Sequence, residues 1–279
     1  MIRLLNRFMG KIHYSKFGPI IARSYELITK ERVSVVRRYN ASFELSNRLP
    51  GEGAILFYAY EPKVTNIFLS LLDESDTVVD VGAWIGYYVL LAASKVGYNG
   101  KVIAIEPHPL NLAKLHRNIE LNGFDNIIVI ESAVGAEETS MELETGSTPL
   151  LHRLKDSNYT YVSNSNDIVK ESRNNTIKVN VRRLDNILAE LGIDDIKLLM
   201  MDIEGYEYNA LLGCGRWIEE GKIDNIIVEV HTYFPQQLYK SFDDILNVLK
   251  HYGYHIEIID HINDSIDRYH IIARRSERG

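Results

Sequence analysis

The stretch that decides the fold is TVVDVGAWIG, residues 77–86. It opens with the β-branched run of a short strand and then carries Gly82 and Gly86. Glycine lets a backbone turn sharply and pass close to a ligand, because it has no Cβ. Residues 87–96 then have helical character. The stretch therefore predicts a strand, a glycine turn that faces a ligand, and a helix.

The same alternation continues along the chain. KVIAI at 101–105 is a second strand, and the helical stretch at 110–122 after it ends at Gly123. Strands that alternate with helices predict an α/β fold, in which helices cover both faces of a mostly parallel sheet. The other predicted strands are 127–131, 177–181, 196–201, 226–230, 255–259 and 269–273, and the other predicted helices are 185–191 and 242–251.

Composition bounds the class of protein and its compartment. The 279 residues are 46% hydrophobic, which is a globular balance, and they include one cysteine, Cys214. One cysteine excludes a disulfide scaffold and a cysteine-based zinc site, and it favours the reducing cytosol. No apolar run reaches 18 residues, and arginines interrupt the first ten residues, so neither a membrane span nor a secretory signal is expected. We expect a cytoplasmic protein.

Charge and composition suggest how the chain is organised. Residues 1–40 carry a net charge of +7, although the whole chain is at −7. We therefore interpret residues 1–60 as a basic helical N-terminal extension and residues 61–279 as the main domain. Residues 145–176 are rich in Ser and Asn and form an insertion in that domain. The basic arm is suited to an anionic lipid, a nucleic acid or a phosphorylated substrate, or to the acidic body itself.

Acidic and glycine residues follow the first two strands. Ligands of parallel α/β sheets bind outside the carboxyl ends of the strands. Asp80, Gly82 and Ala83 stand at the end of the first strand, and Glu106 stands at the end of the second. A carboxylate at that position accepts hydrogen bonds from both ribose hydroxyls. A glycine turn with such an acid is typical of an adenosine-containing cofactor.

The details of the turn indicate which cofactor binds. A dinucleotide site needs the spacing G-x-G-x-x-G, whereas Gly82 and Gly86 are spaced G-x-x-x-G and Trp84 would crowd a pyrophosphate. Asp80 suits a cationic cofactor, because a carboxylate can hold an ammonium group. S-adenosylmethionine has an ammonium group, a sulfonium and a ribose but no phosphate. The pattern favours this cofactor.

Four motifs carry a resemblance to a known family. They are DVGAWIGYYVL at 80–90, AIEPHPLNLAKLHRNIELNG at 104–123, LLMMDIEGYEYNALLG at 198–213 and IIVEVH at 226–231. In this order and spacing they resemble the FkbM-type S-adenosylmethionine-dependent methyltransferases. The resemblance implies a Rossmann-like class I fold with a seven-stranded sheet, an antiparallel last hairpin, and methylation of a hydroxyl on a sugar, lipid or polyketide-like acceptor. It also implies that the cofactor-binding positions are Asp80, Gly82, Gly86 and Glu106.

Three further positions bear on how the cofactor and the acceptor bind. One is the turn after the third strand, and the other two are departures from the family pattern. In this fold the turn that holds Ser132 and Ala133 lies against the adenine, so both are candidates for its edge. Trp84 stands where the family commonly has Asn, which changes the contact near the methionine end of the cofactor. Arg182 and Arg183 stand where small hydroxyl residues are common, and they are candidates to face an anionic acceptor.

The acceptor side is predicted from two later strands. Asp202 and Glu204 follow one strand, and Glu229 and His231 end the next. Parallel neighbouring strands would place these groups on one rim. An alcohol acceptor needs a proton acceptor and near-attack geometry. We hypothesise that His231 is the base and that Asp202 or Glu204 orients it or the substrate. Alternatively, Asp202, Glu204 and His231 bind a divalent cation that lowers the pKa of the acceptor.

Three other functions stay open at this point. An RNA methyltransferase, such as a tRNA-modifying enzyme, would use the basic arm, although such enzymes usually have a different fourth motif from the DIEG at 202–205. A nucleotide-dependent oxidoreductase would need the missing glycine fingerprint. A protein of the same fold could also bind the cofactor without transferring the methyl group. We expect a small-molecule or glycan acceptor, and the sequence indicates no oligomeric state.

Overall fold

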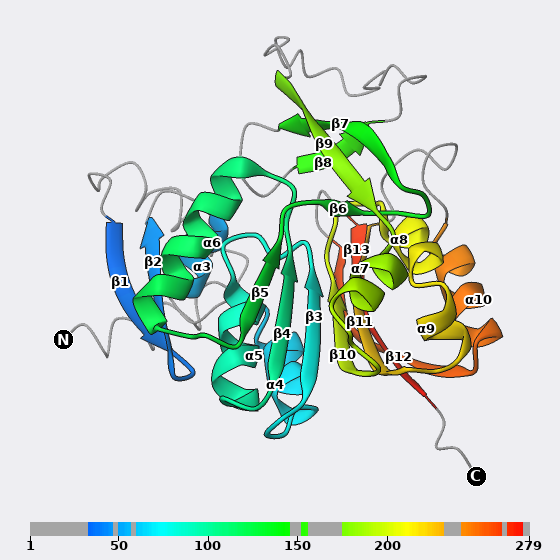
Figure 1. The fold of residues 1–279 in the computed structure, drawn as a ribbon, viewed down its shortest axis with the longest axis horizontal. Helices are drawn as coiled ribbons and strands as arrows, with labels where there is room; N and C mark the ends of the chain where they lie inside the picture. The colour runs from blue at the N-terminus through cyan, green and yellow to red at the C-terminus, as the bar shows by residue number, and fades with distance from the viewer. Residues whose placement is uncertain are drawn as a thin grey trace.

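A computed structural model gives the fold (Figure 1). Helices and strands alternate as the sequence predicts, and no helix among the described residues is long and apolar enough to cross a membrane. Residues 1–32 of the predicted N-terminal extension and most of the Ser- and Asn-rich insertion lie outside the described part. The structure describes residues 33–46, 50–56, 60–145, 152–155, 175–231, 241–263 and 267–275.

A seven-stranded sheet forms the centre of the molecule. Its first five strands by position are parallel, and the last two form an antiparallel hairpin at one edge. The seven-stranded sheet with an antiparallel last hairpin, which the family resemblance implies, is therefore confirmed. The strands, from one edge to the other, are β5 (Ile127–Ile130), β4 (Lys101–Ile105), β3 (Thr77–Val81), β10 (Ile196–Met201), β11 (Ile223–His231), β13 (Asp267–Arg275) and β12 (Tyr254–Asn263).

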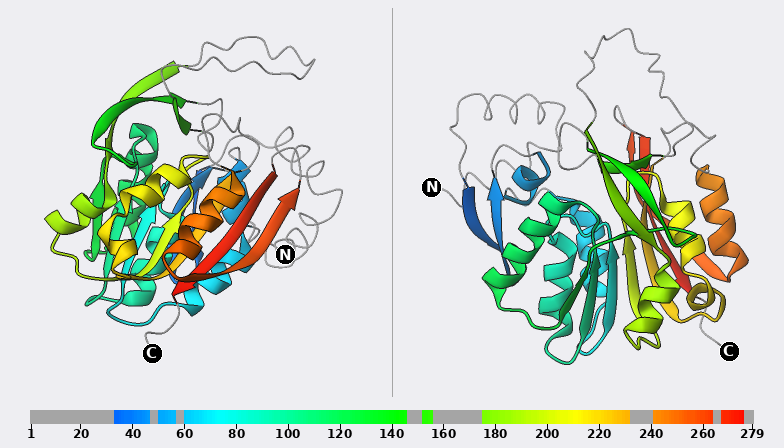
Figure 2. Two further views of the ribbon diagram at one scale, coloured as in Figure 1. Left: turned by 90° about the vertical axis from the view of Figure 1, so that its right-hand side faces the viewer. Right: turned by 45° about the horizontal axis from the view of Figure 1, so that its top comes forward.

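Helices cover both faces of this sheet, as Figure 2 shows from two sides. Consecutive strand residues point to opposite faces, so Val78 packs into one core and Val79 into the other. Both faces are therefore apolar, as a buried parallel sheet requires. On the Val78 face lie α4 (Pro62–Ser70), α5 (Tyr87–Val96) and α6 (Pro109–Asn122), and on the Val79 face lie α7 (Leu184–Glu190), α8 (Glu207–Gly213), α9 (Arg216–Glu219) and α10 (Phe242–His251).

A second, four-stranded sheet follows the end of β5. It has the order β6-β9-β7-β8 and stands above the upper edge of the central sheet in Figure 1. The predicted strand 177–181 belongs to this small sheet. Buried side chains of the sheet, including Leu143 and Val181, form a separate small core. Its strands are β6 (Ala133–Val134), β7 (Thr139–Thr145), β8 (His152–Lys155) and β9 (Asn175–Arg182).

The prediction of a helical extension is wrong for residues 33–46. They form an antiparallel hairpin of β1 (Val33–Arg38) and β2 (Ala41–Ser46), which packs beside α6. The hairpin is stable because one face is apolar and buried, with Phe43 and Leu45 fully enclosed. The short helix α3 (Pro50–Leu56) follows the hairpin.

Candidate active site

One cleft opens where β3, β4 and β10 end. The space between its walls, including the open mouth, is about 920 Å³. The predicted site residues come together there. Gly86 and His231 are the two that do not line the cleft. The eight that do are Asp80, Gly82, Ala83, Glu106, Ser132, Ala133, Asp202 and Glu204.

Gly82 and Gly86 both have positive φ angles, but different neighbours leave no space for a side chain at the two positions. Gly82 has φ +88°, and a Cβ on it would lie 2.0 Å from the backbone oxygen of Asp202. The turn after β3 therefore passes directly against the end of β10, which brings Asp202 to the cleft. Gly86 has φ +91° and faces the side chain of Leu115 on α6. Its role is to let α5 pack against α6 rather than to approach a ligand.

Glu106 is fixed as a hydrogen-bond acceptor in the cleft. Its carboxylate accepts the backbone N–H of Trp84 at 2.8 Å, the N–H of His108 at 2.8 Å and the amide of Asn111 at 3.3 Å. Burial raises the pKa of Glu106 to about 7, although these three hydrogen bonds act in the opposite direction. A buried carboxylate held in this way suits a ligand with hydroxyl donors, such as a ribose.

Asp80 is a second buried carboxyl group in the same cleft. Burial, followed by the charges of Asp202 and Glu106, raises the pKa of Asp80 to about 8. Several acids enclosed together are unfavourable unless a cation joins them. A cationic ligand would relieve this repulsion at Asp80.

The turn after β3 is completed by Trp84 in a left-handed conformation, with φ +48°. Its ring stacks on Tyr60, with ring centroids 5.9 Å apart, and so forms part of the cleft wall. The hydroxyl of Ser132 is buried without a hydrogen-bond partner among the described residues. A hydroxyl ready to bond, two buried carboxyl groups and a partly apolar wall fit S-adenosylmethionine, which offers an adenine edge, ribose hydroxyls and two positive charges.

The acceptor side holds a chain of three ionisable groups. His231 places Nδ1 3.0 Å from Oε1 of Glu207, and its Nε2 lies 3.5 Å from Oε2 of Glu204. Glu207 also accepts the backbone N–H of Gly205 at 2.8 Å. Glu204 has φ +55°, a strained conformation of the kind that occurs at functional sites. Glu204 therefore faces the cleft, with His231 and Glu207 behind it.

The pKa values of His231 and Glu204 are both raised, for different reasons. Burial opposes a charge on His231, but the hydrogen bond and charge of Glu207 raise its pKa well above the usual value. Burial raises the pKa of Glu204 to about 7, and His231 offsets part of that rise. Glu207 therefore favours the charged form of His231, and burial favours the neutral form of Glu204.

Sequence reasoning missed several residues of this region. Tyr60 lines the cleft although it precedes the family motifs, and Glu207 supports His231 from the start of α8. The sequence could have indicated Glu207, because it belongs to the same acidic motif, DIEGYE at 202–207, as Asp202 and Glu204. Arg183 does not face an acceptor: it binds Asp185 at 2.6 Å and the backbone of Ala136.

The neighbouring Arg182 is also engaged in ion pairs, with Glu190 at 2.5 Å and Glu138 at 3.6 Å. These partners lie at the surface next to α7 rather than in the cleft. The prediction that the two arginines bind an anionic acceptor is therefore not supported by their positions.

The sheet order, the glycine turn and the acids at the ends of β3 and β4 define a class I methyltransferase. A family model described as the methyltransferase FkbM domain matches residues 80–256 of the chain. The chain belongs to this family. The family match favours the methyltransferase interpretation over a nucleotide-dependent oxidoreductase.

Individual relatives share parts of the chain. The AMB antimetabolite synthetase AmbE of Pseudomonas aeruginosa is 25% identical over 233 residues, which are 74% of this chain and 11% of that protein. Protein-L-isoaspartate O-methyltransferase 2 of Archaeoglobus fulgidus is 38% identical over 133 residues, which are 46% of this chain and 57% of that protein. The chain thus spans less than two thirds of each of these curated relatives.

A solved structure was also found to be similar. Methyltransferase FkbM from Methylobacillus flagellatus shares 21% identity with a TM-score of 0.46, over 91% of this chain and 58% of that chain.

Proposed function

We propose that the protein methylates a hydroxyl group on a small-molecule acceptor, such as a sugar or a lipid. The observation that carries this proposal is the position of Asp202 and Glu204, which line the same cleft as Asp80 and Glu106. Cofactor-binding and proton-accepting groups therefore share one cavity. Bound S-adenosylmethionine would supply an electrophilic methyl group on a positively charged sulfur.

Glu106 and Asp80 hold the cofactor in this proposal. Glu106 accepts hydrogen bonds from the ribose hydroxyls, and Asp80 pairs with a positive charge. Ser132 and Ala133 border the adenine. Most of the rate enhancement would come from placing the acceptor oxygen in line with the methyl carbon, which a partly apolar cleft with fixed walls favours.

Glu204 is the better candidate for the proton acceptor, rather than His231 as the sequence suggests. Glu204 lines the cleft, whereas His231 is 4% exposed and lies behind it. A pKa of about 7 suits a general base at neutral pH. The acceptor oxygen would take the methyl group as the methyl–sulfur bond breaks and S-adenosylhomocysteine leaves, while the hydroxyl proton would pass to Glu204. His231, within 3.5 Å of Glu204, would orient that carboxylate. Asp202 is placed to orient the hydroxyl.

One relative supports oxygen as the acceptor atom. The Archaeoglobus protein that matches 133 residues of this chain is an O-methyltransferase by name. A divalent cation held by Asp202, Glu204 and His231 remains the alternative way to activate the hydroxyl.

The acceptor class can be tested with a methyl donor that carries a labelled methyl group. The purified protein is incubated with fractions of sugars, lipids and RNA, and the label is followed. We expect the label in a small-molecule fraction, as a methyl ether that resists both alkali and ribonuclease. Label in RNA that ribonuclease releases would support the basic-arm RNA methyltransferase instead. Cofactor binding with no transfer to any fraction would favour a non-catalytic binding protein.

The division of roles is tested once an acceptor is found. We expect Glu204→Gln to lower kcat by about 100-fold, the usual size of a lost general base, with an unchanged dissociation constant for the cofactor. Glu219→Gln, at an exposed position on α9, is the matched control and should leave kcat unchanged. A variant Glu204→Gln with normal kcat, together with a His231→Ala variant that loses activity, would return the role of base to His231.

A further inference from the structure

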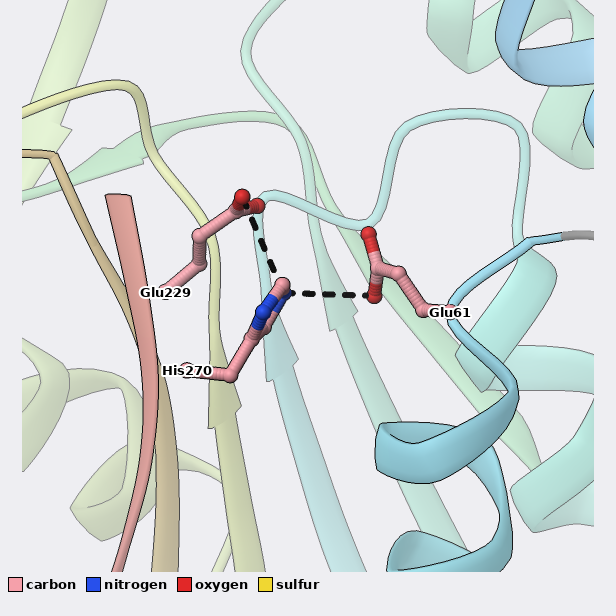
Figure 3. A group of neighbouring side chains, drawn as sticks. All are labelled: Glu61, Glu229 and His270. Atoms are coloured by element: carbon pink, nitrogen blue, oxygen red, sulfur yellow. Dashed lines mark ion pairs between the residues drawn. The ribbon is translucent and has the colours of Figure 1, made fainter. Parts of the chain in front are cut away.

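A second group of ionisable side chains lies outside the residues that line the cleft. It consists of Glu61, at the start of α4, Glu229 on β11 and His270 on β13 (Figure 3). One potential ligand atom from each residue lies within 4.8 Å of the others. Three elements far apart in the sequence thus direct their side chains to one point.

The distances within this group suit a metal ion better than hydrogen bonds. Nε2 of His270 lies 3.6 Å from Oε2 of Glu61 and 3.7 Å from Oε1 of Glu229. Hydrogen bonds between such atoms are about 2.7–3.2 Å long. Two bonds of about 2.1 Å that meet at a tetrahedral angle place their donor atoms about 3.4 Å apart. The imidazole nitrogen therefore stands at ligand spacing from two carboxylates at once.

The group also contains buried polar atoms that lack hydrogen-bond partners among the described residues. His270 is 1% exposed, and neither of its ring nitrogens has a hydrogen-bond partner among the described residues. Glu229 is 3% exposed, and its Oε1 has no hydrogen-bond partner in the same part of the chain. Such atoms are costly to bury unless something binds them. Figure 3 shows both side chains directed toward the space beside Glu61.

The surroundings of the group are acidic. Asp202 lies beside Glu229. The negative charge of Glu61 also acts on Asp202. The positive charge that faces the group comes from Arg268, whose Nη1 is 3.3 Å from Oε1 of Glu229. Another cation at this point would reduce the repulsion among the carboxylates.

We propose that Glu61, Glu229 and His270 bind one divalent transition-metal ion. Two carboxylates and one imidazole are ligands typical of Zn²⁺ and Mn²⁺, whereas Mg²⁺ and Ca²⁺ prefer oxygen ligands alone. Water would complete the coordination. Glu229 also belongs to a second group that could hold an ion, with Asp202 and His231. The proposed site differs from that group, and from the Asp202, Glu204 and His231 set that the sequence suggested, in its ligands Glu61 and His270, and it does not depend on the identity of the acceptor.

The ion would connect the central sheet to one wall of the cleft. Glu61 is followed by α4 and preceded by Tyr60, which stacks on Trp84 in the cleft. Glu61 also accepts a hydrogen bond from the hydroxyl of Tyr88 at 2.7 Å. An ion that joins Glu61 to β11 and β13 would therefore hold Tyr60 in place. Its role would be to position the cleft wall rather than to contact the acceptor.

Metal binding by the whole chain tests this proposal. The protein is treated with a chelator, dialysed, and titrated with Mn²⁺ or Zn²⁺ in a calorimeter, while elemental analysis gives the bound stoichiometry. We expect one ion per chain. Glu61→Gln and His270→Gln should each weaken binding at least tenfold. Circular dichroism and cofactor binding show whether each variant is folded.

Control variants distinguish metal binding at this site from metal binding elsewhere on the chain. His255→Gln changes an exposed histidine on β12 and should leave the affinity unchanged. The proposal is overturned if the native chain binds neither ion. It is equally overturned if binding survives both Glu61→Gln and His270→Gln but is lost in Asp202→Asn, because the ion would then occupy the cleft.

Discussion

Asp80 and Glu106 dominate the cofactor side of the cleft at the scale of single residues. Both are at least 96% buried, and burial is the main reason that their pKa values rise to about 8 and about 7. A ligand with ribose hydroxyls and positive charges binds best when both groups are ionised. Binding of S-adenosylmethionine should therefore release protons near neutral pH.

The affinity for S-adenosylmethionine should consequently depend on pH. Below pH 7 both Asp80 and Glu106 are mostly protonated, and both ionise as the pH rises through 8. We expect the affinity to increase about tenfold or more between pH 6.5 and pH 8.5, since one pKa unit corresponds to a factor of ten. Equilibrium dialysis with labelled cofactor measures it. Asp80→Asn should flatten the dependence, and an affinity that falls as the pH rises would contradict this interpretation.

Single residues also show what can be read from sequence. Glu106 was predictable because the glycine turn and the acid of the next strand lie 24 residues apart in a local pattern. Gly82 was predicted to let the backbone turn close to a ligand. The sequence did not indicate that the turn also passes against the backbone of Asp202, which is more than 100 residues away. Glu61 and His270 meet across the whole domain. No local spacing could indicate their contact.

At the scale of elements, the hairpin of β1 and β2 is held to the domain by side-chain amides of α6. Asn118 is fully buried: its Oδ1 accepts the N–H of Glu44 at 2.8 Å, and its Nδ2 donates to the carbonyl of Ile85 at 2.9 Å. Asn122 forms a similar pair of bonds with Ser42. The hairpin is thus connected to the turn that precedes α5.

Asn118→Ala should destabilise the protein. It leaves the half-buried backbone N–H of Glu44 and the buried carbonyl of Ile85 without Asn118 as a partner, which costs about 2–4 kcal/mol in the free energy of unfolding. Asn186→Ala, which removes an exposed amide bonded to Glu138, should change that free energy by less than about 0.5 kcal/mol. Urea denaturation measures both. Equal effects of the two substitutions would show that the hairpin is not anchored through Asn118.

The elements differ in how well the sequence predicts them. The strand at 77–81 and the helix at 87–96 have the predicted bounds, because their burial patterns are regular. Residues 33–46 were assigned to a helical extension, yet their alternating side chains face α6 and form a hairpin. Their conformation depends on that tertiary contact and on the amides of Asn118 and Asn122. Local propensity alone does not contain this information.

At the scale of the whole molecule, the sheet gathers the functional groups by its topology. The strands β3, β4 and β10 run parallel and end at the same edge, so acids far apart in sequence reach one cleft. The small sheet of β6 to β9 adds Ala133, Val134 and Leu143 to the wall of that cleft. This arrangement explains how one domain can bind a cofactor and an acceptor side by side.

Calorimetric titration of the purified chain with S-adenosylmethionine tests the central claim most directly. We expect one site with an affinity in the micromolar range, and a loss of about tenfold or more in Glu106→Gln, because a charge-assisted hydrogen bond is lost. Glu131→Gln, at an exposed position beyond β5, should bind as the native chain does. A folded native chain that does not bind, or a Glu106→Gln variant that binds equally well, would contradict the assignment of this cleft as the cofactor site.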